Sequence, residues 1–91
     1  MRYVICYDIA DDRRREHVTG VLLDYAARIQ ESVFTAELDV VLNERMQQRL
    51  KAVLDAKEDK LHEFALCGRC EERIWTIGDG KIEKDADFYV I

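Results

Sequence analysis

The sequence is poor in the residues that break or cross-link a chain: its 91 residues include no proline, four glycines and three cysteines. So little proline and glycine leaves no room for a flexible linker, and we expect a single domain over residues 1–91. No run of about 18 apolar residues occurs, which excludes a membrane span. We also find no secretory signal, so the odd number of cysteines indicates reduced thiols in a cytoplasmic protein rather than a disulfide framework.

Several common catalytic motifs are missing as well. No Walker loop, dinucleotide-binding glycine motif, zinc-protease motif or Ser-His-Asp order occurs. The single CxxC sequence at residues 67–70 lacks the second pair that a structural zinc site needs. We therefore interpret it as a turn, with metal binding or redox chemistry as the alternative.

Charged residues are plentiful, and the acidic ones prevail. The 19 Asp and Glu residues exceed the 14 Lys and Arg residues, for a net charge of −5. A hydrophobic fraction of 48% with 36% charged residues is typical of a globular protein and excludes disorder. The negative balance argues against a general nucleic-acid coat protein, but it leaves room for a local basic site.

Apolar spacing predicts alternating strands and helices in the first half of the chain. The continuous apolar run at residues 3–7 is typical of a strand buried on both faces. A helix is expected from residue 11 to about 27, strand character with a bulge or bend from 28 to about 42, and a second helix from about 43. The two helical stripes are Val18, Val21, Leu22 and Tyr25, and Met46, Leu50, Val53 and Leu54.

Three further strands are predicted at residues 62–67, 74–77 and 87–91. We interpret the element order as βαββαβ plus a terminal strand. This order is the α+β, ferredoxin-like pattern of an antiparallel sheet with two helices on one face. The terminal strand has no obvious partner in a four-stranded sheet, and such edges tend to be paired or covered. We therefore expect a second subunit to cover it, and predict a homodimer.

Asp8 is the candidate metal ligand. It ends the buried strand at residues 3–7, where an apolar residue is usual. The alternative is a turn-forming or helix-capping role, since Asp11 and Asp12 follow closely. Mg²⁺ commonly takes one or two carboxylates together with water and phosphate. A dimer axis near the end of this strand would bring two copies of Asp8 together.

Consecutive arginines at residues 13–15 form a candidate phosphate site. They lie in the first turn of the predicted helix, where the helix dipole disfavours cations. The guanidinium groups of Arg14 and Arg15, with the helix amides, could bind phosphate, and the alternative is a solvated face paired with neighbouring acids. Arg28 opens the next strand as a further contact or a strand-end charge. Phe34 is either a core residue or a platform for base stacking.

Several segments of the chain resemble the CRISPR-associated protein 2 family. In the first half these are residues 7–9 (YDI), 11–15 (DDRRR) and 28–34 (RIQESVF). In the second half they are residues 66–70 (LCGRC), 73–74 (RI) and 77–78 (IG). The resemblance covers nearly the whole chain, and its length is similar to that of the family. One departure is His17, where the family usually has Lys or Arg.

The resemblance implies a ferredoxin-like homodimer whose C-terminal strand reaches toward the other subunit. It implies an Mg²⁺-dependent endonuclease of CRISPR adaptation, cleaving phosphodiester bonds of single-stranded RNA or double-stranded DNA, with Asp8 as metal ligand and catalytic residue. The alternative is a non-catalytic scaffold that bridges dimers of the CRISPR integrase and holds spacer DNA. The predicted nucleic-acid-binding residues are Arg14, Arg15, Arg28, Ser32 and Phe34.

Overall fold

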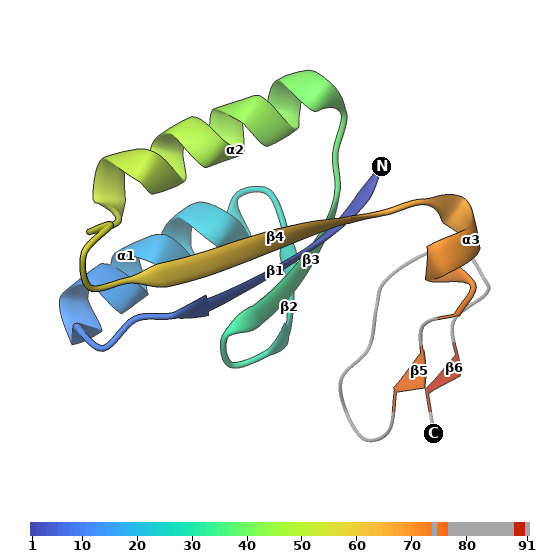
Figure 1. Ribbon diagram of the computed structural model, residues 1–91, viewed down its shortest axis with the longest axis horizontal. Coiled ribbons are helices and arrows are strands. Elements are labelled where there is room, and N and C mark those ends of the chain that lie inside the picture. Colours follow the sequence, from blue (N-terminus) through green and yellow to red (C-terminus); the bar gives the residue numbers. More distant parts are fainter. Residues whose placement is uncertain (74, 77–88, 91) are drawn as a thin grey trace.

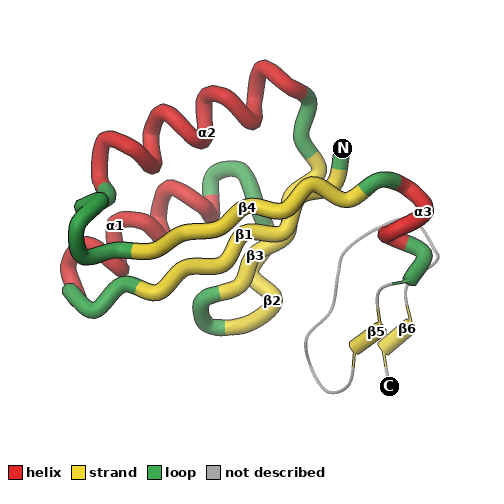
Figure 2. The backbone as a smooth tube through the Cα atoms, in the orientation of Figure 1, coloured by secondary structure: helices red, strands yellow, loops and turns green. Residues whose placement is uncertain are grey.

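The centre of the molecule is a four-stranded antiparallel sheet with the strand order β2-β3-β1-β4 (Figure 1). The computed structural model describes residues 1–73, 75–76 and 89–90. The strands of this sheet are β1 (Arg2–Asp8), β2 (Ala27–Gln30), β3 (Val33–Glu37) and β4 (Lys60–Leu66). Helices α1 (Asp12–Leu23) and α2 (Val40–Val53) lie on one face of the sheet (Figure 2). The ferredoxin-like βαββαβ arrangement predicted from the sequence is therefore confirmed.

The segment expected to bend between residues 28 and 42 is a hairpin. Its turn is formed by Glu31 and Ser32, and the β2–β3 register shifts between Arg28 and Gln30, which is the expected irregularity. Helix α2 begins at Val40, earlier than the predicted start near residue 43. The cause is a helix cap, because the Asp39 carboxylate accepts a hydrogen bond from the Leu42 N–H at 2.8 Å.

Beyond the sheet, the chain forms a short helix α3 (Gly68–Glu71) and two short strands, β5 (Trp75–Thr76) and β6 (Tyr89–Val90). The strands β5 and β6 pair in parallel as a separate sheet. The expected strand at 74–77 thus falls in this second sheet, and residues 74, 77–88 and 91 lie outside the described residues. Because β6 pairs with β5, this pairing does not require a second subunit, and the homodimer stays a prediction.

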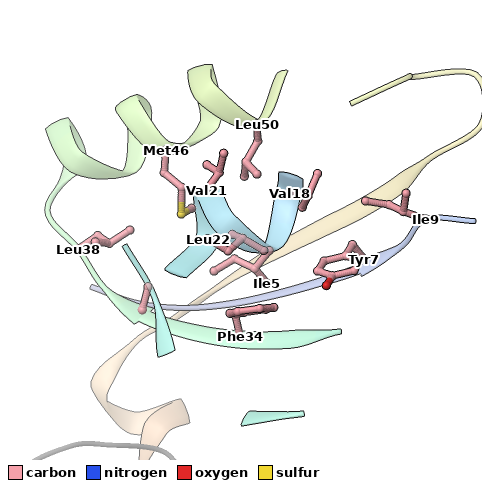
Figure 3. Packing of buried hydrophobic residues seen from close by; sticks show 11 residues of the cluster. Ile5, Tyr7, Ile9, Val18, Val21, Leu22, Phe34, Leu38, Met46 and Leu50 are labelled. Atoms are coloured by element: carbon pink, nitrogen blue, oxygen red, sulfur yellow. The ribbon is translucent and has the colours of Figure 1, made fainter. Parts of the chain in front are cut away.

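The core lies between the sheet and the two helices (Figure 3). The predicted stripe on α1 is confirmed at its three helical positions, which are buried, while Tyr25 follows the end of the helix and is half-buried. On α2 the buried stripe residues are Met46 and Leu50. The largest fully buried side chains are Phe34, Ile5, Leu22, Met46, Val18 and Thr35. Within the described residues, none of the helices has the length and apolar character needed to cross a bilayer.

The loop between α2 and β4 is attached to α1 by an ion pair between Arg14 and Asp59. Arg14 Nε lies 2.9 Å from Asp59 Oδ2 and its Nη2 lies 3.1 Å from Oδ1, so the guanidinium holds both carboxylate oxygens. Asp59, whose side chain is 1% exposed, also accepts a hydrogen bond from the Asp55 N–H at 2.9 Å. The Arg14 hydrogen bond, helped by the one from Asp55, holds the pKa of Asp59 below its ordinary value.

Two neighbouring leucines on α1 test the packing of the core. Leu22 is 0% exposed and Leu23 is 55% exposed. We expect Leu22→Ala to lower the free energy of unfolding by about 2–5 kcal/mol, because it leaves a cavity. The matched control Leu23→Ala should cost less than about 0.5 kcal/mol. Denaturant unfolding of both variants measures the difference, and equal losses would contradict this placement of α1.

The Arg14–Asp59 pair predicts a pH-dependent contribution to stability. The pKa of Asp59 is lowered by folding from its ordinary 3.8, so its stabilisation is complete above that pH and is lost as the pH falls through the folded value. Asp59→Asn should therefore lower the melting temperature at pH 7, and the difference from the wild type should shrink below about pH 3.8.

The control for this measurement is Glu44→Gln, which neutralises an exposed carboxylate on α2. Its melting temperature should stay close to that of the wild type at pH 7. A difference between the wild type and Asp59→Asn that stays constant from pH 7 to pH 2 would contradict the role of the ion pair.

Candidate functional site

A cleft of about 510 Å³ opens where β1 ends and α1 begins. Three elements meet there, because β1 leads into α1 at this end of the sheet and the β2–β3 turn lies beside it. The polar and charged lining residues are Tyr7 and Asp8 from β1, Arg15, Glu16 and Thr19 from α1, and Arg28, Glu31 and Ser32 from the β2–β3 hairpin. The cleft therefore brings together the predicted residues Asp8, Arg15, Arg28 and Ser32.

Asp8 is the last residue of β1, and its side chain is exposed. Its carboxylate makes no hydrogen bond or ion pair with any residue that the structure describes. The cap of α1 is Asp11, which accepts a hydrogen bond from the Arg14 N–H at 2.8 Å, so Asp8 has no part in capping. Asp8 thus presents two carboxylate oxygens to the cleft, which can accept a cation or a donor from a ligand.

Arg15 is folded back over the connection between β1 and α1. Its Nη1 donates to the Ile9 carbonyl at 2.9 Å, and its guanidinium pairs with the Asp12 carboxylate. These contacts keep the side chain close to the end of β1 while leaving it partly exposed. A guanidinium held in this way can bind an anion without first losing much conformational freedom.

Arg28 lies on an apolar base formed by Phe34. The guanidinium carbon is 5.3 Å from the centre of the Phe34 ring, which is a cation–π distance. Its Nη2 donates to the Glu31 carbonyl at 3.0 Å. Phe34 itself is 0% exposed, so its ring has no free face for a base. Its part in the site is to support Arg28 from the core.

Arg14 does not line the cleft. Its guanidinium is engaged by Asp59 and also by Glu58, with Nη2 at 3.0 Å from the Glu58 Oε2. The Asp59 hydrogen bond raises the pKa of Arg14 above its ordinary value, which keeps the pair ionised. Adjacent residues on a helix point about 100° apart, so Arg14 and Arg15 reach different neighbours from one turn. The structure therefore separates two residues that the sequence placed in one cluster.

Tyr7 and Thr19 are among the cleft residues that were not recognised as such from the sequence. The Tyr7 hydroxyl lies 2.7 Å from the Thr19 hydroxyl and 3.4 Å from the Glu31 carbonyl oxygen. Figure 3 shows the Tyr7 ring at the margin of the core, beside Phe34. A tyrosine in an otherwise apolar strand is itself a signal, because a buried phenol needs a hydrogen-bond partner. Thr19 carries no comparable signal in the sequence.

Comparison with known proteins identifies the family. Residues 1–74 match the family model described as CRISPR associated protein Cas2. The CRISPR-associated endoribonuclease Cas2 1 of Chloroflexus aurantiacus is 38% identical over 93 residues, covering 100% of both chains. The CRISPR-associated endonuclease Cas2 2 of Thermus thermophilus is 38% identical over 69 residues, or 76% of this chain and 77% of its own.

Solved structures agree with the family model. The crystal structure of Streptococcus pyogenes Cas2 at pH 6.5 superposes with a TM-score of 0.73 at 25% identity, covering 81% of this chain and 95% of that one. The family model, over residues 1–74, includes β1 through β4, and the Chloroflexus aurantiacus relative extends over all the cleft residues. On these grounds the chain belongs to the Cas2 family of CRISPR-associated proteins.

Proposed function

We propose that this chain acts as a homodimeric, Mg²⁺-dependent endonuclease that cleaves phosphodiester bonds of nucleic acid in CRISPR adaptation. The observation that carries the proposal is the cleft at the end of β1, where Asp8 shares a lining with Arg15 and Arg28. Guanidinium groups bind phosphate oxygens, and a carboxylate binds hard cations. The names of the relatives, endoribonuclease and endonuclease, support the same chemistry and leave the choice between RNA and DNA open.

Asp8 has the donor chemistry that suits Mg²⁺. This ion commonly takes one or two carboxylates and completes its shell with water and phosphate. Among residues 1–73, 75–76 and 89–90, no group of three or more His, Cys, Asp or Glu residues could hold a metal. An open site formed by Asp8, Asp8 of the partner subunit and a phosphate is consistent with that donor set. When bound, the cation supplies Lewis acidity toward a phosphoryl oxygen.

The arginines would hold the substrate backbone and offset the negative charge that builds up during cleavage. Arg28 is set in place by Phe34 and the Glu31 carbonyl before any ligand arrives. Ser32 adds a hydroxyl donor to the lining of the cleft. We assign Arg14 to the ion pair with Asp59 rather than to nucleic-acid binding.

The homodimer is supported by the sheet face that α1 and α2 leave uncovered. Val4 and Cys6 alternate along β1 with the buried Ile5 and Tyr7, so they face away from the helices. Phe64, which lies opposite Val4 on β4, is 53% exposed. Packing this face against the same face of a second copy would remove these side chains from water.

A second candidate function is a non-catalytic scaffold that bridges integrase dimers and holds spacer DNA. It is favoured by the way Arg15 and Arg28 are each held in place by contacts within the protein. Cations preset in this manner can bind duplex phosphates and fix the position of the DNA without any cleavage. In that case Asp8 would serve only the geometry of the cleft or the metal-linked stability of the dimer.

Asp8→Asn separates the two functions, because it keeps the shape of the side chain and removes its charge. With labelled single-stranded RNA and duplex DNA, we expect Mg²⁺-dependent cleavage to fall roughly 100-fold or more, the scale of losing one charged group at a reaction centre. EDTA should abolish cleavage by the wild type. Asp24→Asn, which alters an exposed carboxylate outside the cleft, should cleave as the wild type does.

The mass of each protein is measured first, by light scattering at micromolar concentration. A monomeric wild type would contradict the homodimer. Equal cleavage by the wild type and a dimeric Asp8→Asn variant, or none by either, would overturn the nuclease proposal. DNA capture together with the integrase that survives in Asp8→Asn would then favour the scaffold.

Arg28→Ala tests the phosphate contact without reference to cleavage. We expect it to weaken binding of RNA or DNA and to reduce the slope of log K against log salt concentration by about 1, the value for one lost phosphate contact. The matched control is Arg45→Ala, an exposed arginine on α2 outside the cleft, which should keep the wild-type slope. The same reduction in both variants would show that Arg28 acts only through overall charge.

A further inference from the structure

The Thr19 hydroxyl begins a series of hydrogen bonds to which the function proposed above assigns no role. Thr19 Oγ1 lies 2.7 Å from Tyr7 Oη, which lies 3.4 Å from the Glu31 carbonyl oxygen. A carbonyl oxygen can only accept, so when the single hydroxyl hydrogen of Tyr7 is directed to Glu31, Thr19 donates its own hydrogen to Tyr7. These contacts link α1 through β1 to the β2–β3 turn.

The series of hydrogen bonds ends at the Glu31 carbonyl, which also holds Arg28. The Glu31 carbonyl that accepts from Tyr7 also accepts from Arg28 Nη2 at 3.0 Å. The same tyrosine supports Arg28 by a second route, because its ring stacks on Phe34 with centroids 6.1 Å apart. The Phe34 ring in turn lies beneath the Arg28 guanidinium. Tyr7 thus contacts both of the groups that place Arg28.

A threonine at position 19 does not help to stabilise helix α1. Its β-branched side chain is a poor helix former compared with alanine or leucine. The hydroxyl instead contacts a residue 12 positions away, on a different element. Thr19 lines the cleft but bears no charge for phosphate or metal. Its contribution to the site is therefore made through Tyr7.

We infer that Thr19 is a positioning residue of the cleft: through the Tyr7 hydroxyl it fixes the β2–β3 turn, and with it the Arg28 guanidinium, relative to Asp8. This inference rests on the proposed function, in which Arg28 receives a phosphate. Tyr7 directly precedes Asp8 on β1. The hydrogen bonds of Tyr7 therefore join the phosphate-binding side of the cleft, at Arg28, to its metal-binding side, at Asp8.

Two substitutions of one residue isolate the hydroxyl. Thr19→Val keeps the shape and removes the hydroxyl, whereas Thr19→Ser keeps the hydroxyl. With labelled single-stranded RNA and duplex DNA, and with Ca²⁺ in place of Mg²⁺, we expect Thr19→Val to weaken binding about three- to tenfold, the effect of one lost hydrogen bond. Thr19→Ser should restore binding to within about twofold of the wild type. Both variants are compared at equal folded fraction, established by thermal unfolding.

A double-mutant cycle tests whether the two hydroxyls act as one unit. Tyr7→Phe should lose about as much affinity as Thr19→Val, since each breaks the same series of hydrogen bonds. The double variant should lose little more than either single variant. Losses that add in full would overturn the inference.

A measurement that needs no nucleic acid separates this inference from the proposed function. The order of the Arg28 Nε–Hε group, from NMR relaxation, should decrease in Thr19→Val and recover in Thr19→Ser. Unchanged order in Thr19→Val would overturn the positioning role whatever the binding data show. If the wild type binds neither RNA nor DNA, the proposed function fails, while a loss of Arg28 order in Thr19→Val still supports the positioning role.

Discussion

The burial of the Phe34 ring is the constraint on which both the core and the cleft depend. The ring has no exposed surface, and Phe34 lies opposite Ile5 in the register of β3 and β1. One aromatic neighbour is Tyr7, and the cationic neighbour is Arg28. A long charged side chain on an exposed strand end would otherwise sample many conformations. Here the core itself supplies the surface on which Arg28 lies, so a change in core packing also changes the cleft.

The order of the elements could be predicted because apolar residues recur at the spacing of a helix or a strand along most of the sequence. The residues of the stripe on α1, for example, are buried in the structure. The boundaries were harder to predict where a single hydrogen bond sets them. Asp39 caps α2 and starts it at Val40, although exposed apolar residues follow the cap. The turn between β2 and β3 uses Glu31 and Ser32, with neither glycine nor proline to mark it. The pairing of β5 with β6 joins distant segments, which local patterns do not report.

The candidate site was predictable to the extent that it follows from positions along single elements. Asp8 ends a strand, and Arg15 lies in the first turn of the helix that follows, so the two lie near one another in any fold of this order. The partner of Arg14, in contrast, is Asp59, 45 residues away. The hydrogen bond between Tyr7 and Thr19 likewise joins two elements. Such contacts depend on how the helices and strands pack against one another. The chemistry of a side chain alone does not show which of many possible residues it will contact.

The acidic surplus of the chain and the proposed affinity for nucleic acid are reconciled by the arrangement of charges in the cleft. The chain has a net charge of −5, and three carboxylates line the cleft, from Asp8, Glu16 and Glu31. Arg15 is partly neutralised by Asp12, whereas Arg28 donates to an uncharged carbonyl. A phosphodiester entering this cleft therefore meets more negative than positive charge at short range, where salt screens least. In the proposed function Asp8 would hold a divalent cation whose charge would offset these carboxylates. Asp8 would then contribute to substrate entry as well as to cleavage, and Arg28 would hold the phosphate in place.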